Sequence, residues 1–408
     1  MLNVVVLNGG RGAATLIPAL LGQDGLRVTS VVNAYDDGKS TGEIRRFFGM
    51  LGPSDIRKVQ ELMLNDQDQD YAASLHLFRY RFPDHCDRAA VLQDLAAFAD
   101  GKRADLTGVS FSSPTVCDAL RTFVREFLEG LGVIEKVKAE RLSFSDCSIM
   151  NCIYAGAFLH FRRNIEQATL SISRLFRLRG TVLPNAIENK TLVALREDGE
   201  MLYSEAEIVE LRSNVRIERI YLVDHVPKRV QFEPLTVAEK RAFLDRHHSF
   251  VEVGPQVRLA LQQADLIIYS AGTQHSSLYP TYLTTGLARS IADNRSAFKV
   301  FVTNIGADYE TPSYVASDYL RGAFRYLNLA DERVYALGEL FSRVLINTGR
   351  RKDDETYVEF DEGGFADLPV SRDLTDLESV ETPGRHDGLK LVSTILDRFE
   401  QFKPGLDG

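Results

Sequence analysis

Two adjacent carboxylates, Asp36 and Asp37, open the segment whose residue types and spacing point most directly to chemistry. They are followed by Gly38-Lys39-Ser40-Thr41-Gly42, and they come shortly after the apolar run 28–32, which predicts a buried strand. Open α/β sheets bind their ligands where such strands end. Paired acids repel a bare phosphate, but they suit a phosphate that arrives with Mg²⁺. The segment therefore predicts metal-assisted chemistry on a phosphorylated ligand.

The residues Gly38-Lys39-Ser40 also match the end of a P-loop, whose full pattern is G-x-x-x-x-G-K-S/T. The first glycine of that pattern would stand at position 33, where the chain has Asn33. Asp36 and Asp37 would moreover lie inside the anion cradle, where a P-loop needs backbone N–H groups. We therefore set the P-loop interpretation aside.

Two further strand ends carry candidate binding residues. Residues 3–7 predict a strand, Asn8-Gly9-Gly10-Arg11-Gly12 a tight turn, and residues 13–21 a helix, which together form the first unit of a doubly wound sheet. Backbone N–H groups at the start of such a helix bind phosphate. A later strand at 264–269 leads into a loop and helix with small and hydroxyl residues, 270–277. A simple packing turn remains an alternative for the glycines, because glycine turns after strands are common.

A dinucleotide-binding Rossmann motif is a second alternative. Asp36 follows Gly12 by 24 residues, near the spacing of a ribose-binding acid. The G-x-G-x-x-G pattern is incomplete, however, because Thr15 stands where the third glycine belongs. The sequence contains neither a G-x-S-x-G nucleophile motif nor an H-E-x-x-H metal motif, and its histidines are isolated.

Composition limits the class of protein. The chain has 408 residues, 44% hydrophobic and 26% charged, with a net charge of −9 that argues against a nucleic-acid partner. No run reaches the roughly 18 apolar residues needed to span a membrane, and no signal peptide is evident. The four cysteines fit neither a disulfide framework nor a zinc site. We expect a cytoplasmic protein with no membrane partner, and a homodimer as its oligomeric state.

The predicted organisation is a Rossmann-like, doubly wound, mostly parallel α/β sheet over residues 1–340. A helical insertion is expected at about 65–135, where Ala-, Leu- and Phe-rich helical patterns follow a polar stretch. Alternating apolar residues predict a small β-rich subdomain at about 181–223. Residues 341–408 are expected to be a C-terminal extension that ends in an amphipathic helix.

With these residues in view, the chain resembles the 2-phospho-L-lactate transferases and the related gluconeogenesis factors that bind UDP-sugars. The family's Gly-Gly-Gly-Thr-Gly opening resembles 8–12, and its Asp-Asp-Gly-Gly-Ser-Ser-Gly segment resembles 36–42. Its Gly-Met-Leu-Pro-Pro-Gly-Asp-Ile-Arg segment is similar to 49–57, which ends Asp55-Ile56-Arg57. Its Gly-Pro-Gly-Ser loop is similar to 270–273, and its Glu-Thr-x-Gly-Tyr-x-Ala-Ser-Asp segment to 310–318.

The resemblance implies a Rossmann-like fold that holds a GDP- or UDP-linked nucleotide diphosphate conjugate. It implies Mg²⁺ on Asp36, Asp37 and Asp55, which are also the catalytic candidates. The implied ligand-binding residues are Gly9, Gly10, Arg11, Gly12, Ser40, Ser148, Asn151, Gly272, Thr273, Ser276, Ser277 and Asn304. Transfer of a phosphorylated group needs positioning and charge neutralisation rather than a covalent nucleophile.

The chain departs from the family pattern at three points. Asn8 and Arg11 replace a glycine and a threonine, and the family's His-Ser-Leu-Gly-Asn helix start keeps only Ser148 and Asn151. An arginine at position 11 can hold a diphosphate or carboxylate bidentately. Two functions follow as expectations. One is a Mg²⁺-dependent transferase that passes a phosphorylated small acid to the hydroxyl of a small-molecule acceptor, and the other is a non-catalytic UDP-sugar sensor.

Overall fold

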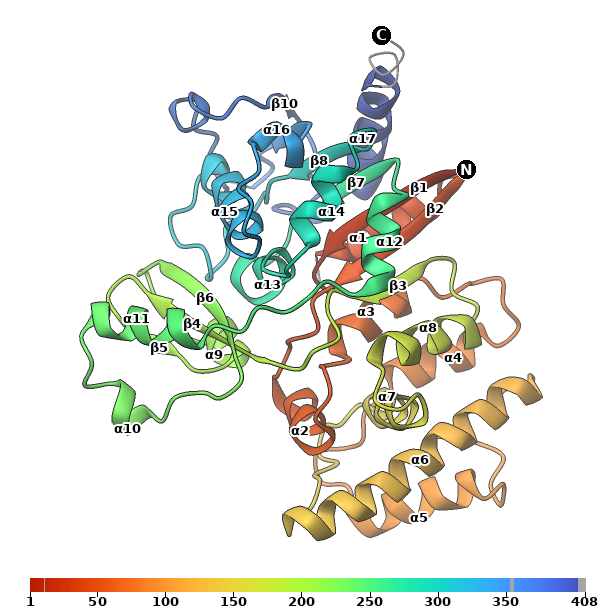
Figure 1. The fold of residues 1–408 in the computed structure, drawn as a ribbon. Helices are drawn as coiled ribbons and strands as arrows, with labels where there is room; N and C mark the ends of the chain where they lie inside the picture. Colours follow the sequence, from red (N-terminus) through yellow and green to blue (C-terminus); the bar gives the residue numbers. More distant parts are fainter. Residues whose placement is uncertain (11, 353–355, 403–408) are drawn as a thin grey trace.

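A seven-stranded parallel sheet forms the centre of the protein, in the order β10-β9-β8-β7-β1-β2-β3 (Figure 1). The computed structural model describes residues 1–10, 12–352 and 356–402. The strands are β1 (Leu2–Asn8), β2 (Leu26–Val32), β3 (Thr181–Pro184), β7 (Leu266–Tyr269), β8 (Phe298–Val302), β9 (Arg343–Asn347) and β10 (Ser371–Thr375). Each pairs with its neighbours in parallel, so the carboxyl ends of the strands share one edge.

The central strands form where the sequence has continuous apolar runs. Residues 4–7 of β1 and 266–269 of β7 are at most 2% exposed. Burial on both faces is what a parallel sheet between two helical layers requires. The expected doubly wound α/β fold is thus confirmed.

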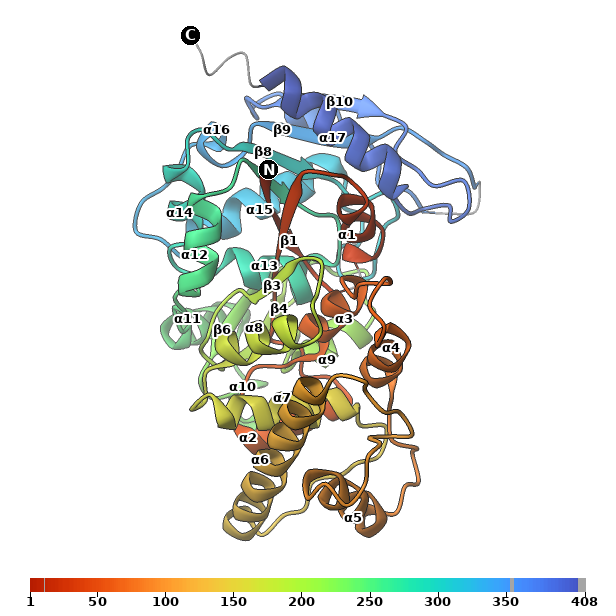
Figure 2. The ribbon, with the colours of Figure 1, turned by 90° about the vertical axis from the view of Figure 1, so that its right-hand side faces the viewer.

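Helices cover both faces of this sheet (Figure 2). On one face α1 (Ala13–Leu21) contacts α3 (Ser54–Leu62) and α17 (Gly388–Phe402). On the other, α14 (Leu287–Asp293) contacts α12 (Pro255–Gln262) and α16 (Leu337–Leu340). The remaining helices near the sheet are α2 (Lys39–Phe48), α7 (Ile149–His160), α8 (Ile165–Leu175), the π-helical η1 (Gln274–Leu278), α13 (Tyr279–Tyr282), α15 (Ala316–Leu329) and the short η2 (Gly363–Phe365).

The helical insertion projects away from the sheet, at the lower right of Figure 1. It consists of α4 (Tyr71–Arg79), α5 (Arg88–Ala99) and α6 (Pro114–Lys138). α6 packs along both α5 and α7, which joins the insertion to the main body.

The small β subdomain lies on the opposite side of the molecule (Figure 1). Its antiparallel sheet has the order β5-β4-β6, with β4 (Thr191–Arg196), β5 (Met201–Leu202) and β6 (Ile217–Val223). Its helices are α9 (Glu205–Glu210), α10 (Arg229–Phe232) and α11 (Val237–His247). β3, which we expected within the β-rich stretch 181–223, instead pairs with β2 at the edge of the main sheet.

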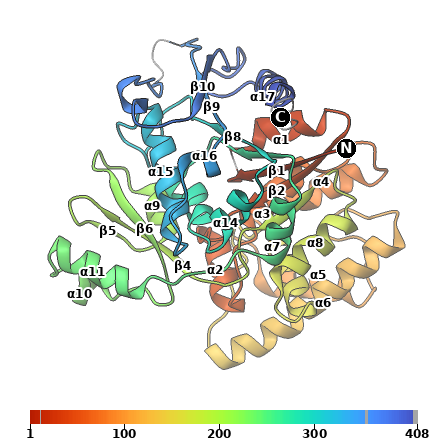
Figure 3. The same ribbon diagram turned by 45° about the horizontal axis from the view of Figure 1, so that its top comes forward.

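The C-terminal extension is continuous with the main sheet. β9 pairs with β8, β10 pairs with β9, and α17 packs against α1 (Figure 3). The boundary that we expected near residue 340 therefore falls between two neighbouring strands of one sheet, and the extension adds two strands to its edge.

All four cysteines are free thiols, with Cys147 and Cys152 buried and Cys86 and Cys117 half-buried. No helix among the described residues combines the length and the apolar character needed to cross a membrane.

Candidate functional site at the carboxyl end of the sheet

The strand order of the sheet reverses between β1 and β7. β2 and β3 follow on one side of β1, and β7 to β10 follow on the other. Ligands of open α/β sheets bind at such a switch point. The turn after β1 and the loop after β7 touch there, because a methyl group on Gly12 would lie 2.3 Å from the Ala271 carbonyl oxygen. Only glycine permits this approach of the two backbones.

The amides of the glycine turn make no hydrogen bond within the described part of the chain. Within the described residues, the backbone N–H groups of Gly9, Gly10 and Gly12 have no hydrogen-bond acceptor. The helix that follows, α1, has no side chain capping its N-terminus. Free amides at the positive, N-terminal end of a helix can bind a phosphate group. Arg11 lies outside the described residues, so its expected phosphate contact stays a prediction.

Asp36 and Asp55 lie together beside this turn. A methyl group on Gly10 would lie 2.4 Å from Asp55 Oδ1. Asp55 is 8% exposed and pairs with Lys58 Nζ at 2.7 Å. Burial, and then the negative charge of Asp55, raises the pKa of Asp36, whose Oδ1 accepts a hydrogen bond from the Gly38 amide at 3.0 Å. Two of the predicted metal ligands are therefore neighbours of the glycine turn.

Asp37 holds the β subdomain in place. Its Oδ1 accepts a hydrogen bond from the Ala206 amide in the first turn of α9 at 3.0 Å. The nearby Arg45 guanidinium donates to the carbonyl oxygens of Tyr35 at 2.6 Å and Lys190 at 2.7 Å. These bonds join the acidic segment to Lys190, where the chain enters the subdomain, and to α9 within it. One oxygen of Asp37 is thus engaged in a structural contact.

Two further carboxylates, Glu205 and Glu310, belong to the acidic cluster and were not among the sequence candidates. Burial, and then the charges of Asp36 and Asp37, raise the pKa of Glu205 to about 9. No local pattern marks Glu205, because the subdomain fold alone brings it to the site. Glu310 opens one of the stretches that carry the family resemblance, and that signal could have identified it.

Glu310 binds the start of η1. Its Oε2 accepts hydrogen bonds from the amides of His275 and Ser276, both at 2.9 Å, and Oε1 accepts one from the Ser276 hydroxyl. Burial, and then the charge of Asp308, raises the pKa of Glu310 to about 7. We expected Ser276 to bind the ligand, but a buried carboxylate of the chain occupies these donors.

The other polar groups of this loop also have internal partners. The Thr273 hydroxyl donates to Ser277 Oγ at 2.9 Å. Asn304 Oδ1 accepts a hydrogen bond from the Gly272 amide at 2.9 Å, and Asn304 Nδ2 donates to the Gly272 carbonyl at 3.1 Å. The polar groups of the loop therefore hold the loop itself together, and its free phosphate donors are fewer than we expected.

Ser40, Ser148 and Asn151 meet at the other end of the 36–42 segment. Asn151 Nδ2 donates to Ser40 Oγ at 3.4 Å. Ser148 is the N-cap of α7, yet its hydroxyl caps no helix amide and, among the described residues, has no partner. All three side chains are buried. The structure thus brings these three predicted binding residues together.

The acidic cluster suits a metal that is shared with a ligand. In the described ranges, no group of three or more His, Cys, Asp or Glu side chains is arranged to hold a metal ion. Mg²⁺ needs no such cage, because it keeps several waters and binds one or two carboxylates together with substrate phosphates. Asp36 and Asp55, next to the free amides of the glycine turn, fit that donor set.

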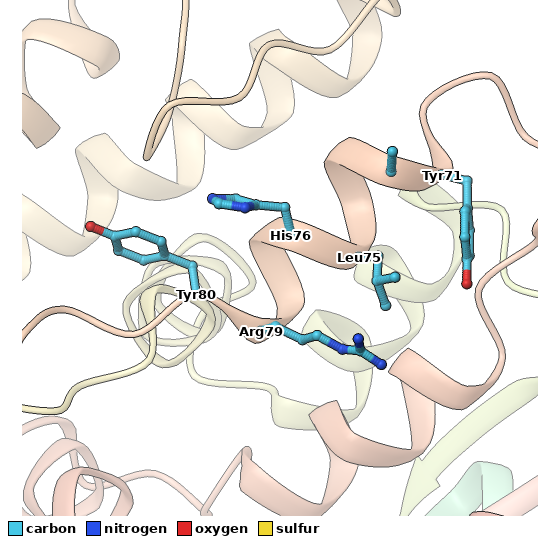
Figure 4. Close-up of a pocket in the computed structure, with 6 residues that line it drawn as sticks. Tyr71, Leu75, His76, Arg79 and Tyr80 are labelled. Atoms are coloured by element: carbon cyan, nitrogen blue, oxygen red, sulfur yellow. The ribbon is translucent and has the colours of Figure 1, made fainter.

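A separate hollow of about 480 Å³ lies on the insertion (Figure 4). It is lined by Tyr71, Ala72, Leu75, His76, Arg79 and Tyr80. These residues come from α4 and its end, and none belongs to the acidic cluster or the glycine turn. We do not assign this hollow to the site.

Known proteins share both the sequence pattern and the fold. A putative gluconeogenesis factor of Thermotoga maritima is 24% identical over 408 residues, which cover 97% of this chain and 98% of that protein. The gluconeogenesis factor of Listeria monocytogenes is 24% identical over 401 residues, 96% of this chain and 94% of that protein. The crystal structure of protein BH3568 from Bacillus halodurans matches with a TM-score of 0.66 at 20% identity, covering 97% of this chain and 99% of that one.

A second crystal structure of BH3568, described as a member of the UPF0052 family, has the same TM-score at 19% identity and covers 97% of this chain and all of that one. These structures support the fold. The family model described as 2-phospho-L-lactate transferase CofD matches residues 4–383, which include the glycine turn, the acidic segment and both later loops. The chain therefore belongs to the CofD family.

Proposed function

We propose that the protein binds a nucleotide diphosphate conjugate with Mg²⁺ at the carboxyl ends of β1 and β7. We further propose that a hydroxyl acceptor attacks the outer phosphate of this conjugate and takes up the phosphorylated small acid, while the bond between the two phosphates breaks and the nucleoside monophosphate leaves. The membership of the CofD family, whose model is described as a transferase, supports the reaction class.

One observation carries the proposal, the direct contact between the glycine turn and Asp55. Asp55 Oδ1 lies 2.4 Å from where a methyl group on Gly10 would be, and the amides of that turn are free among the described residues. A phosphate on the amides and a cation on Asp36 and Asp55 would therefore be adjacent. This is the arrangement that charge neutralisation of a diphosphate needs.

The residues have distinct proposed roles. The free amides at the start of α1 hold the diphosphate, and Asp36 and Asp55 hold the metal. Bound Mg²⁺ would supply positive charge to the transferring phosphate oxygens. Glu205, beside Asp36 and Asp37, is a buried carboxylate of the kind that moves protons in active sites, which favours a reaction over simple binding.

A second candidate function is a non-catalytic regulator of carbon or cell-wall metabolism that binds a UDP-sugar. The names of the similar proteins from Thermotoga maritima and Listeria monocytogenes, both gluconeogenesis factors, favour it. The same site would serve both functions, so turnover and not binding distinguishes them.

A thermal-shift panel of GDP, UDP and UDP-sugars, each with and without Mg²⁺, tests both functions together. Stabilisation by a nucleotide that depends on Mg²⁺ is expected, and the absence of any stabilisation would contradict both. The Asp36→Asn variant then separates them, since in a transferase it abolishes turnover while much of the nucleotide affinity remains.

A further inference from the structure

Two cations flank Ser40 at the end of the 36–42 segment that faces the insertion. Lys39 immediately precedes Ser40, and Arg81, which follows α4, places Nη2 3.5 Å from Ser40 Oγ. Both share the single carboxylate of Asp146, which bonds to Arg81 and lies 3.8 Å from Lys39 Nζ. Two positive charges face one negative charge, so this spot has a net positive charge.

A buried hydroxyl next to these cations lacks a partner. Ser148 Oγ has no hydrogen-bond partner among the described residues, and Ser148 is only 1% exposed. Ser148 is the N-cap of the twelve-residue helix α7, so the positive end of this helix points to the same place. A buried polar group without a partner is costly, and a bound ligand is one way in which it becomes satisfied.

The backbone at Lys39 is also unusual. Lys39 has φ of 44°, in the left-handed region that favours glycine, and glycine stands at the matching position of the family segment that 36–42 resembles. This chain therefore has an exposed cation at a position where glycine would be less strained.

We propose that Lys39, Ser40 and Arg81 form a second oxyanion subsite, which takes a phosphate or carboxylate group of the hydroxyl acceptor. This inference rests on the proposed function, because there the donor diphosphate is already neutralised at the glycine turn by amides and metal. Lys39 and Arg81 are then not needed for the donor diphosphate and can bind a second anion. Arg81 turns its guanidinium from Asp146 towards the oxyanion, whose oxygens give the Ser148 hydroxyl the partner that it lacks and also accept from the Ser40 hydroxyl. The acceptor is accordingly a hydroxy acid or a phosphorylated alcohol.

Calorimetric titration of inorganic phosphate, and separately of acetate, into the full chain saturated with Mg²⁺ and either GDP or UDP tests the subsite. We expect one of the two anions to bind at one further site. Arg81→Ala should weaken this binding at least tenfold and Lys39→Gly several-fold, while nucleotide affinity changes less than twofold. Tighter binding of phosphate identifies a phosphorylated acceptor, and tighter binding of acetate identifies an acidic one.

Arg79→Ala is the matched control, because Arg79 is a neighbouring exposed arginine paired with Glu61. It should leave anion binding unchanged. Lys39→Gly removes the strained backbone as well as the charge, so its loss of binding cannot come from misfolding.

The outcomes separate this inference from the proposed function. If no nucleoside diphosphate binds, the titration is repeated without it, and Arg81-dependent anion binding then upholds the subsite although the proposed function fails. If a nucleotide binds but neither anion does, or if anion binding is insensitive to both variants, the subsite is wrong and the proposed function stands.

Discussion

The acidic and basic ends of the Asp36–Gly42 segment are close neighbours in sequence, yet they are held in different ways. At the acidic end, Asp36 and Asp37 each accept a backbone hydrogen bond, and the buried Arg45 fixes the chain around them. At the basic end, the side chains of Lys39 and Arg81 are 78% and 38% exposed and share one carboxylate.

The buried carboxylates at the acidic end are therefore fixed before a ligand binds, whereas the exposed cations at the basic end can move when a ligand binds. Burial and mutual repulsion raise the pKa values at the acidic end, which is a cost that a bound cation would remove. Exposed ion pairs such as those of Lys39 and Arg81 add little to stability. Variants at the acidic end should therefore change stability strongly, and variants at the basic end should change mainly ligand binding.

The largest expected effect is that of Arg45→Lys. A lysine cannot reach the carbonyl oxygens of Tyr35 and Lys190 together with Asn189 Oδ1, which the guanidinium bonds at 2.6, 2.7 and 2.8 Å. We expect a loss of about 3 kcal/mol in the free energy of unfolding, measured by urea denaturation. Arg81→Lys at the basic end should cost less than about 1 kcal/mol. Equal losses of stability in Arg45→Lys and Arg81→Lys would contradict the difference between the two ends of the segment.

Glu310→Gln should change how stability depends on pH. The pKa of Glu310 is raised from 4.5 to about 7 in the folded protein. Between these two pH values, the folded state therefore binds more protons than the unfolded state. The free energy of unfolding of the wild type therefore falls as pH rises from about 4.5 to 7, by on the order of 3 kcal/mol from this group. Subtracting the Glu310→Gln profile from the wild-type profile should isolate this fall. A flat difference between the two profiles would contradict the burial of an ionisable Glu310.

Gly10→Ala should displace the glycine turn from the Asp55 side chain. The added methyl group would lie 2.4 Å from Asp55 Oδ1, so we expect a loss of about 2 kcal/mol and weaker nucleotide binding. Gly38→Ala is the matched control, since Gly38 has φ of −68° and its nearest contact there is Asp36 Oδ1 at 3.5 Å. The control should retain both stability and binding. Thermal melts with and without nucleotide report both quantities.

The smallest expected effect is a gain. Lys39→Gly removes a left-handed lysine and should raise the free energy of unfolding by about 1 kcal/mol. Lys39→Ala loses the same charge but keeps the unfavourable φ, so it should bring no such gain. If both variants change stability alike, charge and not backbone strain governs this position.

The parts of the site that could be predicted are those with a local signal. Strands β1, β2 and β7 are apolar runs, and the glycines and acids that follow them stand at strand ends. Glu205 could not be found in this way, because it reaches Asp36 only through the fold of the subdomain, far along the chain. The sequence also could not show that the Ser276 amide is already bonded, because a loop pattern does not reveal that Glu310 will accept its hydrogen bond.

The two strands that the C-terminal extension adds to the sheet, β9 and β10, show the same limit. β9 is a short apolar run, and β10 (Ser371–Thr375) is largely exposed at the sheet edge, with Leu374 48% exposed. An exposed edge strand such as β10 has no continuous apolar pattern to mark it. For this reason the sequence alone assigns two strands of the main sheet to a separate C-terminal extension.

The central claim is that a nucleotide diphosphate and a metal meet between the glycine turn and Asp55. Its most direct test is the affinity of GDP and UDP, measured by calorimetry with and without Mg²⁺, in the wild type and in Asp55→Asn. We predict that Mg²⁺ tightens binding of one nucleotide at least tenfold in the wild type and less than twofold in the variant. Equal affinity with and without Mg²⁺ in the wild type, or an undiminished effect of Mg²⁺ in Asp55→Asn, would contradict it.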